Sequence, residues 1–317
     1  MPDRVREILD YYRGDNLAVL GKLAMILNHG ILGGTGRIMI LPVDQDMEHG
    51  PAPTFGPNPV MFDPHAIFEL ALKAGFSAVA MPKGALQAAA GDFPGAIPMI
   101  CKLNSSTYLN KSGDAPTPAV YCSVEEALQI GSAAIGYTIY PGSANFTQTY
   151  ENAQALVETA KRYGLAAVIW SYPRGSGLGL HKKGQAEGKK ANDALDVVGY
   201  AARIAAQLGA DIIKVKPPTE LIVLDNSLEP EDMFAAIPHE TLAERVAYVV
   251  QCAFDGHRIV IFSGGAKKGA EGMLETNRQI HKGGGFGTIQ GRNSIQRPES
   301  EAVPFIGKIM DIYADKE

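Results

Sequence analysis

The sequence predicts a single (β/α)8 barrel, and three observations support this prediction. Eight short apolar runs recur along the 317 residues, amphipathic segments separate them, and several of these segments end in Gly just before the next run. Strand and helix in repeated alternation indicate parallel strands joined by right-handed crossovers. A chain of this length is compatible with one barrel of this type.

The predicted strands are short runs rich in β-branched and aliphatic residues. They are 37–43, 77–81, 97–103, 133–140, 165–170, 211–215, 258–262 and, as the weakest run, 286–290. Closure into a barrel accounts for eight such runs most economically. A doubly wound open sheet is the alternative, although the GxGxxG pattern that often marks it is absent after the first run.

Amphipathic segments predict the helices of the barrel, and Ser123 and Glu126 have the spacing of a capping box. The predicted helical segments are 64–75, 123–131, 149–164, 194–209, 239–256 and 298–315. We expect residues 1–36 to be an N-terminal helical extension and lead-in, and residues 37–317 to be the catalytic barrel. The segments 177–193 and 224–240 interrupt the pattern without ending it, so we expect loops or lids there.

Composition indicates an ordinary globular protein, with 46% hydrophobic and 20% charged residues. The formal net charge of -5 does not favour nucleic acid as a partner. Three cysteines without CxxC spacing indicate buried free thiols in a reducing cytoplasm. The N-terminus lacks the apolar core of a signal peptide, and no apolar run approaches the roughly 20 residues of a membrane span. We therefore expect a cytoplasmic protein without a membrane partner.

Polar residues at the ends of the strands are the candidate site, because barrel enzymes carry their chemistry there. The first strand is followed by DQDMEHGP, which brings Asp44 and His49 together with further carboxylates. No HxH or HExxH pattern is present, so we expect no metal. Asp44 is the candidate for hydrogen bonding and proton relay near a substrate, and a turn or helix cap is the alternative role.

Glycines after the last two strands indicate a phosphate site. SGG (263–265) and GRN (291–293) allow backbone amides to approach an anion closely, as loops seven and eight of this fold often do. Tight turns alone are the alternative explanation. The predicted phosphate-binding residues are Ser263, Gly264, Gly265, Gly291 and Arg292.

The sixth strand carries two lysines, Lys214 and Lys216, in DIIKVKPP. Alternation along a strand turns both amines toward the same side, which in a closed barrel is the interior mouth. Burial and mutual repulsion there favour a neutral, nucleophilic amine that can form a Schiff base with a carbonyl compound. A solvated edge strand is the alternative. In WSYPRGSG, Trp170 and Tyr172 share one face, and a nearby cation is expected to lower the pKa of Tyr172 for acid–base work.

These motifs occur in a fixed order: VDQDMEHGP, CKLN, CSVEEA, IGYTIYPGS, WSYPRG, AARIAAQLGADIIKVK, SGG and GRN. In this order they resemble the archaeal-type class I fructose-1,6-bisphosphate aldolases, barrels related to deoxyribose-phosphate aldolase. The resemblance runs from about residue 38 to the C-terminus. After the first strand the chain has Val-Asp-Gln-Asp where archaeal members commonly have Tyr-Asp-His-Gly, and Asp44 is the residue in common.

The resemblance implies roles for individual residues. Lys214 would form the Schiff base, Tyr172 would transfer protons, Trp170 would line the reacting centre and Asp44 would contact the substrate hydroxyls. The phosphate-binding residues named above would hold the 1-phosphate of the substrate. Further substrate- or phosphate-binding candidates are Lys216, Arg174, Lys102 and His49.

The resemblance implies reversible cleavage of fructose 1,6-bisphosphate without a metal or other cofactor. A transaldolase-type 2-amino-3,7-dideoxyheptulosonate synthase, or a related sugar-phosphate lyase or transferase, is the nearest alternative. The tryptophan of WSYPRG favours the aldolase. A sugar-phosphate sensor without catalysis is a remote alternative. The resemblance also implies a homo-oligomer, often a decamer of two stacked pentameric rings.

Overall fold

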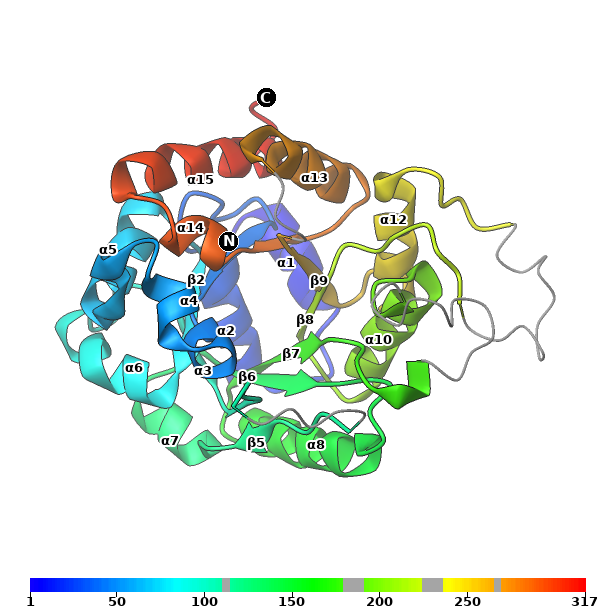
Figure 1. Ribbon diagram of the computed structural model, residues 1–317, viewed down its shortest axis with the longest axis horizontal. Helices are drawn as coiled ribbons and strands as arrows, with labels where there is room; N and C mark the ends of the chain where they lie inside the picture. Colours follow the sequence, from blue (N-terminus) through cyan, green and yellow to red (C-terminus); the bar gives the residue numbers. More distant parts are fainter. Residues whose placement is uncertain (110–114, 179–190, 224–235, 265–268) are drawn as a thin grey trace.

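Eight parallel strands close into a barrel in the computed structural model, and helices surround it (Figure 1). The structure describes residues 1–109, 115–178, 191–223, 236–264 and 269–317. The neighbouring strands around the barrel follow the order β1-β10-β9-β8-β7-β6-β3-β2. The predicted barrel is therefore confirmed, and the open sheet is excluded.

The barrel strands lie where the apolar runs predicted them, with ends shifted by one or two residues. They are β1 (Ile38–Pro42), β2 (Ala78–Pro82), β3 (Met99–Lys102), β6 (Ala134–Ile139), β7 (Ala166–Ser171), β8 (Ile212–Val215), β9 (Ile259–Ser263) and β10 (Gly287–Ile289). Two short strands, β4 (Asn104–Ser105) and β5 (Ala119–Val120), form a separate antiparallel pair after β3.

The predicted helices are present. They are α5 (Pro64–Ala74), α7 (Val124–Gln129), α8 (Phe146–Arg162), α10 (Leu195–Gln207), α12 (Leu242–Cys252) and α15 (Glu299–Tyr313). Ser123 and Glu126 form the expected capping box at the start of α7. Helices that the sequence analysis did not assign are α3 (Gln45–His49), α4 (Pro51–Phe55), α6 (Lys83–Ala89), α13 (Ala270–Lys282) and α14 (Arg292–Ile295). Single turns of 3-10 helix are η1 (Pro59–Phe62), η2 (Ala90–Asp92) and η3 (Ser176–Leu178).

Strand alternation separates two layers of the core. Val168, Trp170 and Ile212 belong to the cluster inside the barrel, whereas Ile169 and Ile213 belong to the layer between strands and helices. Lys214 has the same parity as Ile212, so its side chain points into the barrel. Period two therefore fixes the direction of this lysine before any loop is considered.

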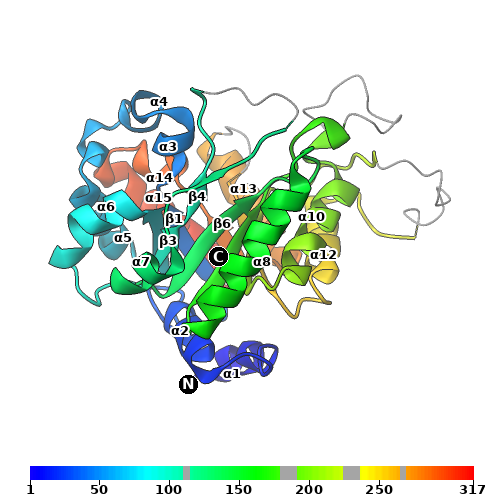
Figure 2. The same ribbon diagram turned by 90° about the horizontal axis from the view of Figure 1, so that it is seen from below.

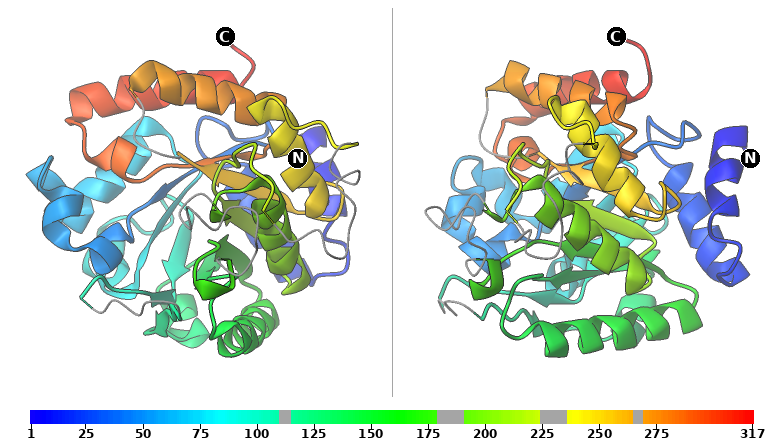
Figure 3. Two further views of the ribbon diagram at one scale, coloured as in Figure 1. Left: turned by 45° about the vertical axis from the view of Figure 1, so that its right-hand side comes forward. Right: turned by 90° about the vertical axis from the view of Figure 1, so that its right-hand side faces the viewer.

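Two N-terminal helices, α1 (Asp3–Asp10) and α2 (Leu17–Leu27), close the end of the barrel opposite to α3 and α4 (Figure 2). Their apolar side chains, among them Val5 and Leu23, join the interior cluster. The Tyr12 hydroxyl donates to the Asp211 carbonyl oxygen at 2.6 Å and accepts from the Ile259 amide at 2.9 Å. Figure 3 shows these helices projecting on the side away from the strand-end loops. The site must therefore open at the carboxyl ends of the strands.

Candidate active site

A pocket of ≈ 560 Å³ opens at the carboxyl ends of the strands. Strands β1, β3, β6, β7, β8, β9 and β10 and the loops that follow them supply its lining. Of the site residues expected from the sequence, all but Gly265 line it, and Gly265 lies outside the described residues. The expected residues in the lining are Asp44, His49, Lys102, Trp170, Tyr172, Arg174, Lys214, Lys216, Ser263, Gly264, Gly291 and Arg292.

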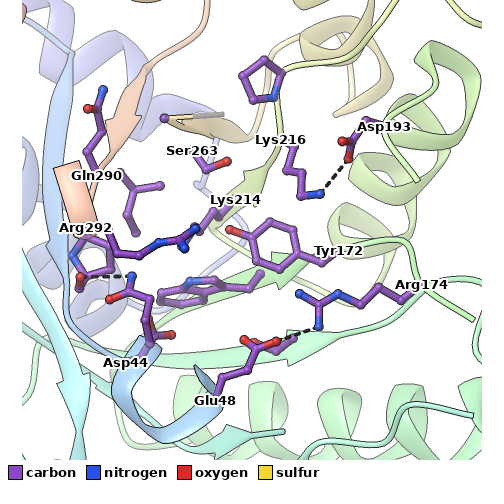
Figure 4. A pocket seen from close by; sticks show the side chains of 18 of the residues that line it. Asp44, Glu48, Tyr172, Arg174, Asp193, Lys214, Lys216, Ser263, Gln290 and Arg292 are labelled. Atoms are coloured by element: carbon purple, nitrogen blue, oxygen red, sulfur yellow. Dashed lines mark hydrogen bonds and ion pairs between the residues drawn. The ribbon is translucent and has the colours of Figure 1, made fainter. Parts of the chain in front are cut away.

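Lys214 lies on β8 with only 4% of its surface exposed. Its Nζ is 5.1 Å from the centroid of the Trp170 ring and 5.4 Å from that of Tyr172 (Figure 4). Burial lowers the pKa of Lys214 to about 8, against the opposing effect of Asp44. A substantial fraction of the amine is then neutral near physiological pH, which is the form that attacks a carbonyl carbon.

Lys102 is a second buried lysine near the indole of Trp170, and it is the last residue of β3. Its Nζ lies 5.3 Å from the Trp170 centroid and donates to the Asn104 side-chain oxygen at 3.0 Å. Burial, opposed by Asp44 and assisted by the nearby Lys214, lowers the pKa of Lys102 to about 8. Gly136 on β6 makes room for this group, because a Cβ there would lie 2.7 Å from the indole.

Tyr172 follows the last residue of β7, and its amide donates to the Ile139 carbonyl oxygen at 3.1 Å. Burial raises the pKa of the Tyr172 hydroxyl well above its usual value, and Asp44 raises it further. Lys216 and Arg174 oppose this effect without reversing it. The expected lowering of this pKa by a neighbouring cation is therefore wrong, because desolvation of the phenolate outweighs the cations. Resting Tyr172 is a proton donor.

Asp44 directly precedes α3, but its side chain makes no capping hydrogen bond to that helix. The alternative role as a helix cap is therefore not supported, and the carboxylate lines the pocket. Glu48, four residues later, forms an ion pair with Arg174 at 2.7 Å. His49 packs edge-on against Tyr108, with ring centroids 4.5 Å apart.

The loops after β9 and β10 lie side by side at the rim of the pocket. A Cβ on Gly264 would lie 3.0 Å from the Asn293 side-chain amide, and a Cβ on Gly291 would overlap the Gln45 amide and the Pro42 carbonyl oxygen. Gly291 therefore permits a close backbone approach to Pro42 that a residue with a Cβ would disturb, whereas Gly264 lies in tight contact with the Asn293 side chain. Arg292 begins the short helix α14 and adds a cation beside the pocket.

Lys216 lies two residues beyond Lys214 and also lines the pocket, as strand alternation predicts. Its ammonium pairs with Asp193 at 2.9 Å. The cation that helps to lower the pKa of Lys214 is Arg292 rather than Lys216, so the expected repulsion between the two strand lysines is corrected. The sequence analysis missed Asp193, because no short-range spacing joins residues 23 positions apart.

Gln45 was also missed as a pocket residue. Its side-chain amide donates to the Pro42 carbonyl oxygen at 3.3 Å and packs against Gly291. The available signal was its position directly after Asp44 at the end of a strand. Within the described residues, no three His, Cys, Asp or Glu side chains are grouped so as to hold a metal ion. No helix in the same described ranges has the length and apolar character needed to cross a membrane.

A family model described as DeoC/LacD family aldolase matches residues 38–297 of this sequence. The chain belongs to this aldolase family. This confirms the family that the motifs indicated. The chain is 34% identical over 309 residues to "Probable fructose-bisphosphate aldolase class 1" of Chlamydia muridarum, covering 95% of this chain and 86% of the relative. It is 35% identical to the "Fructose-bisphosphate aldolase class 1" of Thermoproteus tenax, covering 85% and 88% of the two chains.

Solved structures of aldolases share the fold of this family member. An archaeal fructose-1,6-bisphosphate aldolase with its catalytic Lys covalently bound to the carbinolamine intermediate matches with a TM-score of 0.71 and 31% identity, covering 91% of this chain and 97% of the other. A fructose-bisphosphate aldolase from Slackia heliotrinireducens matches with a TM-score of 0.76 and 26% identity, covering 96% and 93%.

Proposed function

We propose that this chain is a class I aldolase that reversibly cleaves fructose 1,6-bisphosphate to dihydroxyacetone phosphate and glyceraldehyde 3-phosphate. The observation that carries the proposal is the buried Lys214 amine, with its pKa of about 8, inside a pocket that also contains Tyr172 and Arg292. The relatives from Chlamydia muridarum and Thermoproteus tenax carry names for this activity. No metal and no other cofactor is required, because the lysine imine itself serves as the electron sink.

Imine formation begins when the neutral Lys214 amine attacks the C2 carbonyl of the open-chain ketose. A proton moves from nitrogen to oxygen and gives the neutral carbinolamine. Tyr172, a phenol in the resting protein, donates its proton to the departing hydroxyl, so that water leaves and the iminium forms. The Trp170 ring face lies 5.1 Å from the Lys214 nitrogen and stabilises the resulting cation.

Carbon–carbon cleavage uses the phenolate left by this step. The Tyr172 phenolate takes the proton of the C4 hydroxyl, the C3–C4 bond breaks and its electron pair neutralises the iminium as an enamine. Glyceraldehyde 3-phosphate departs. Tyr172 then returns the proton to C3. Water hydrolyses the new iminium, which releases dihydroxyacetone phosphate and the neutral Lys214 amine and returns the remaining proton to the Tyr172 phenolate. One side chain thereby acts in turn as acid and base.

The two ends of the substrate are held by different parts of the pocket. The 1-phosphate binds at Ser263, Gly264 and Arg292, and the backbone of the neighbouring Gly291 adds to the cradle. Asp44 accepts hydrogen bonds from substrate hydroxyls. Arg174, His49 and Lys102 contact the remaining oxygens. Such positioning contributes several kcal/mol toward a barrier of this kind.

The cellular setting follows from the same resemblance. We infer a cytoplasmic homo-oligomer, with a decamer of two pentameric rings as the expected form. A mass of about ten times 33.8 kDa by light scattering supports the decamer, and a mass near 33.8 kDa contradicts it.

Trapping with borohydride tests the chemistry directly. Incubation with fructose 1,6-bisphosphate and borohydride should add the ketose or triose phosphate to Lys214, as peptide mass spectrometry would show, and activity should disappear. EDTA should leave cleavage unchanged. A label on Lys216 would reverse the assignment of the nucleophile. Loss of activity with EDTA but not with borohydride and substrate would reject the mechanism. Transaldol activity assayed in parallel tests the synthase alternative.

A further inference from the structure

The two strand lysines occupy different electrostatic surroundings although they share a face. Lys214 is 4% exposed within the barrel, whereas the Lys216 side chain is 38% exposed and pairs with Asp193 at 2.9 Å. Figure 4 shows Lys216 reaching from its strand toward the Asp193 carboxylate, above the Tyr172 ring. An ion pair this close to the reacting centre fixes where the second ammonium lies. It also keeps this ammonium from competing with Lys214 as the nucleophile.

The backbone of Asp193 is hydrogen-bonded to the chain that follows β8. The Thr219 amide donates to the Asp193 carbonyl oxygen at 2.7 Å, and the Thr219 hydroxyl donates to the same oxygen at 3.1 Å. Two residues further along each of these two segments, the Leu195 amide donates to the Leu221 carbonyl oxygen at 2.8 Å. The segment entering α10 is thus joined to the segment leaving β8.

A small apolar cluster supports this junction from beneath. Its buried members come from η3, from the start of α10 and from the chain after β8, and Leu221 packs against them. They are Leu178, Ala191, Ala194, Val197 and Val223. Two prolines, Pro217 and Pro218, stiffen the link between Lys216 and Thr219. Asp193 therefore has a fixed position relative to Lys216, which an exposed ion pair without such support lacks.

The position of the Lys216 ammonium affects Tyr172, because this cation favours the Tyr172 phenolate. Burial and Asp44 both disfavour the Tyr172 phenolate, and the proposed reaction needs that phenolate. Lys216 is the cation that favours it most, ahead of Arg174. Arg174, the second cation, is paired with Glu48 at 2.7 Å, just as Lys216 is paired with Asp193. A fixed ammonium near the phenol compensates the charge that develops when the proton leaves.

We propose that Asp193 is a positioning residue that holds the Lys216 ammonium beside Tyr172, so that a cation accompanies the phenolate through each proton transfer. The inference rests on the proposed function and deepens it. Lys216 then acts as a counter-ion rather than as a phosphate ligand. In imine formation the Tyr172 proton goes to the leaving hydroxyl, and in enamine formation the phenolate takes a proton from C3. Lys216 keeps its own proton in both steps.

Hydrogen exchange at C3 of dihydroxyacetone phosphate isolates this step from cleavage. Exchange with deuterated water requires the imine and a proton transfer through Tyr172, but no bisphosphate. Asp193→Asn and Lys216→Met should each slow exchange at least about tenfold, while borohydride still labels Lys214 to the wild-type extent and KM changes less than about twofold. The pH dependence of exchange in Asp193→Asn should move to higher pH. Asp193→Glu should restore most of the rate.

A double-variant cycle tests whether Asp193 acts through Lys216. The variant carrying both Asp193→Asn and Lys216→Met should be no slower than Lys216→Met alone, because the carboxylate has nothing left to position. Asp10→Asn, which removes an exposed ion pair between the last residue of α1 and Arg13, is the matched control and should exchange at the wild-type rate. Melting temperatures of all variants identify any that fail to fold, and Asp193→Glu then carries the test.

Three outcomes would overturn the inference. Normal exchange in Asp193→Asn would remove the positioning role, and additive losses in the double variant would show that Asp193 acts independently of Lys216. A raised KM with unchanged exchange at saturation would make the pair a phosphate contact. Wild-type exchange without cleavage of fructose 1,6-bisphosphate would instead reject the proposed function and leave the positioning role standing. A wild-type protein that neither forms the imine nor exchanges C3 would remove both.

Discussion

Trp170 and Lys214 lie opposite one another on the neighbouring strands β7 and β8, and the Lys214 nitrogen is 5.1 Å from the centroid of the indole ring. Strand register alone creates this pair, since both residues point into the barrel. The ring face is attractive to a cation on that nitrogen. A neutral amine gains little from it, whereas the iminium formed from the amine carries a lasting positive charge. The indole therefore favours the iminium over the neutral amine.

Replacement of Trp170 by Phe should weaken imine formation. A smaller ring with a weaker quadrupole stabilises the iminium less, by about 1 kcal/mol, which corresponds to a decrease of about fivefold in the equilibrium constant. The fraction of Lys214 labelled by borohydride at a fixed, subsaturating concentration of dihydroxyacetone phosphate measures this. Labelling equal to that of the wild type would show that the indole only fills space above Gly136.

The pH dependence of imine formation should follow the lowered pKa of Lys214, which is about 8. Below pH 7 the neutral fraction of the amine grows about tenfold for each unit of pH, and above about pH 9 it is nearly complete. The initial rate of borohydride-sensitive labelling should rise and then level accordingly. A rate still rising steeply between pH 9 and pH 10 would indicate a solvent-exposed amine with an ordinary pKa.

Replacement of Lys214 by Met should stabilise the fold while abolishing labelling. The pKa of Lys214 is lowered by burial from 10.5 to about 8, so the unfolded chain binds this proton more tightly than the folded protein. The resulting cost, about 3 kcal/mol, is fully present below pH 8 and vanishes as the pH rises through 10.5. Denaturant unfolding should therefore show Lys214→Met to be more stable by about 1–3 kcal/mol at pH 7.

The same comparison at pH 10 supplies the control. There the wild-type amine is neutral in the folded state and partly neutral in the unfolded state, so the advantage of the variant should shrink. An advantage of equal size at both pH values would trace the effect to better packing by Met. A variant less stable than the wild type at pH 7 would contradict the burial argument itself.

The barrel and the direction of Lys214 could be predicted from the sequence because both depend on local periodicity. The apolar run at 37–43 corresponds to β1 at Ile38–Pro42, and the parity of β8 follows from Ile212 and Lys214 alone. The bounds of helix α13 were not assigned from the sequence, since its segment has no long apolar stripe. Its polar outer face hides the buried Met273 and Ile280.

The electrostatic partners could not be predicted, because they come from different loops. Asp193 meets Lys216 across the loop after β7, and Arg292 reaches Lys214 from the loop after β10. Alternation along a strand predicts which side of the sheet a lysine faces, but it does not predict which charged residues of other loops lie near that lysine. The pKa of Tyr172 was predicted in the wrong direction because burial of its hydroxyl outweighs the nearby cations Lys216 and Arg174.

Replacement of Gly291 by Ala should weaken phosphate binding without harming the lysine chemistry. Gly291 has a φ of -90°, which Ala adopts easily, so backbone strain plays no part. The added methyl group instead overlaps the Gln45 amide and the Pro42 carbonyl oxygen, and the loop after β10 must move away. Its amides would then lose charge-assisted hydrogen bonds to phosphate, and the KM for fructose 1,6-bisphosphate should rise about tenfold or more.

Gly307→Ala on α15 is the matched control, because a Cβ at Gly307 meets nothing within 4 Å. Its KM should equal that of the wild type. Dihydroxyacetone, which carries no phosphate, separates the two possible causes in Gly291→Ala: borohydride labelling of Lys214 by this ketone should be unchanged, since only the anion cradle has moved. Equal losses with the phosphorylated and the unphosphorylated ketone would mean that the methyl group disturbs the whole pocket, and the loops after β9 and β10 would then have no special part in holding phosphate.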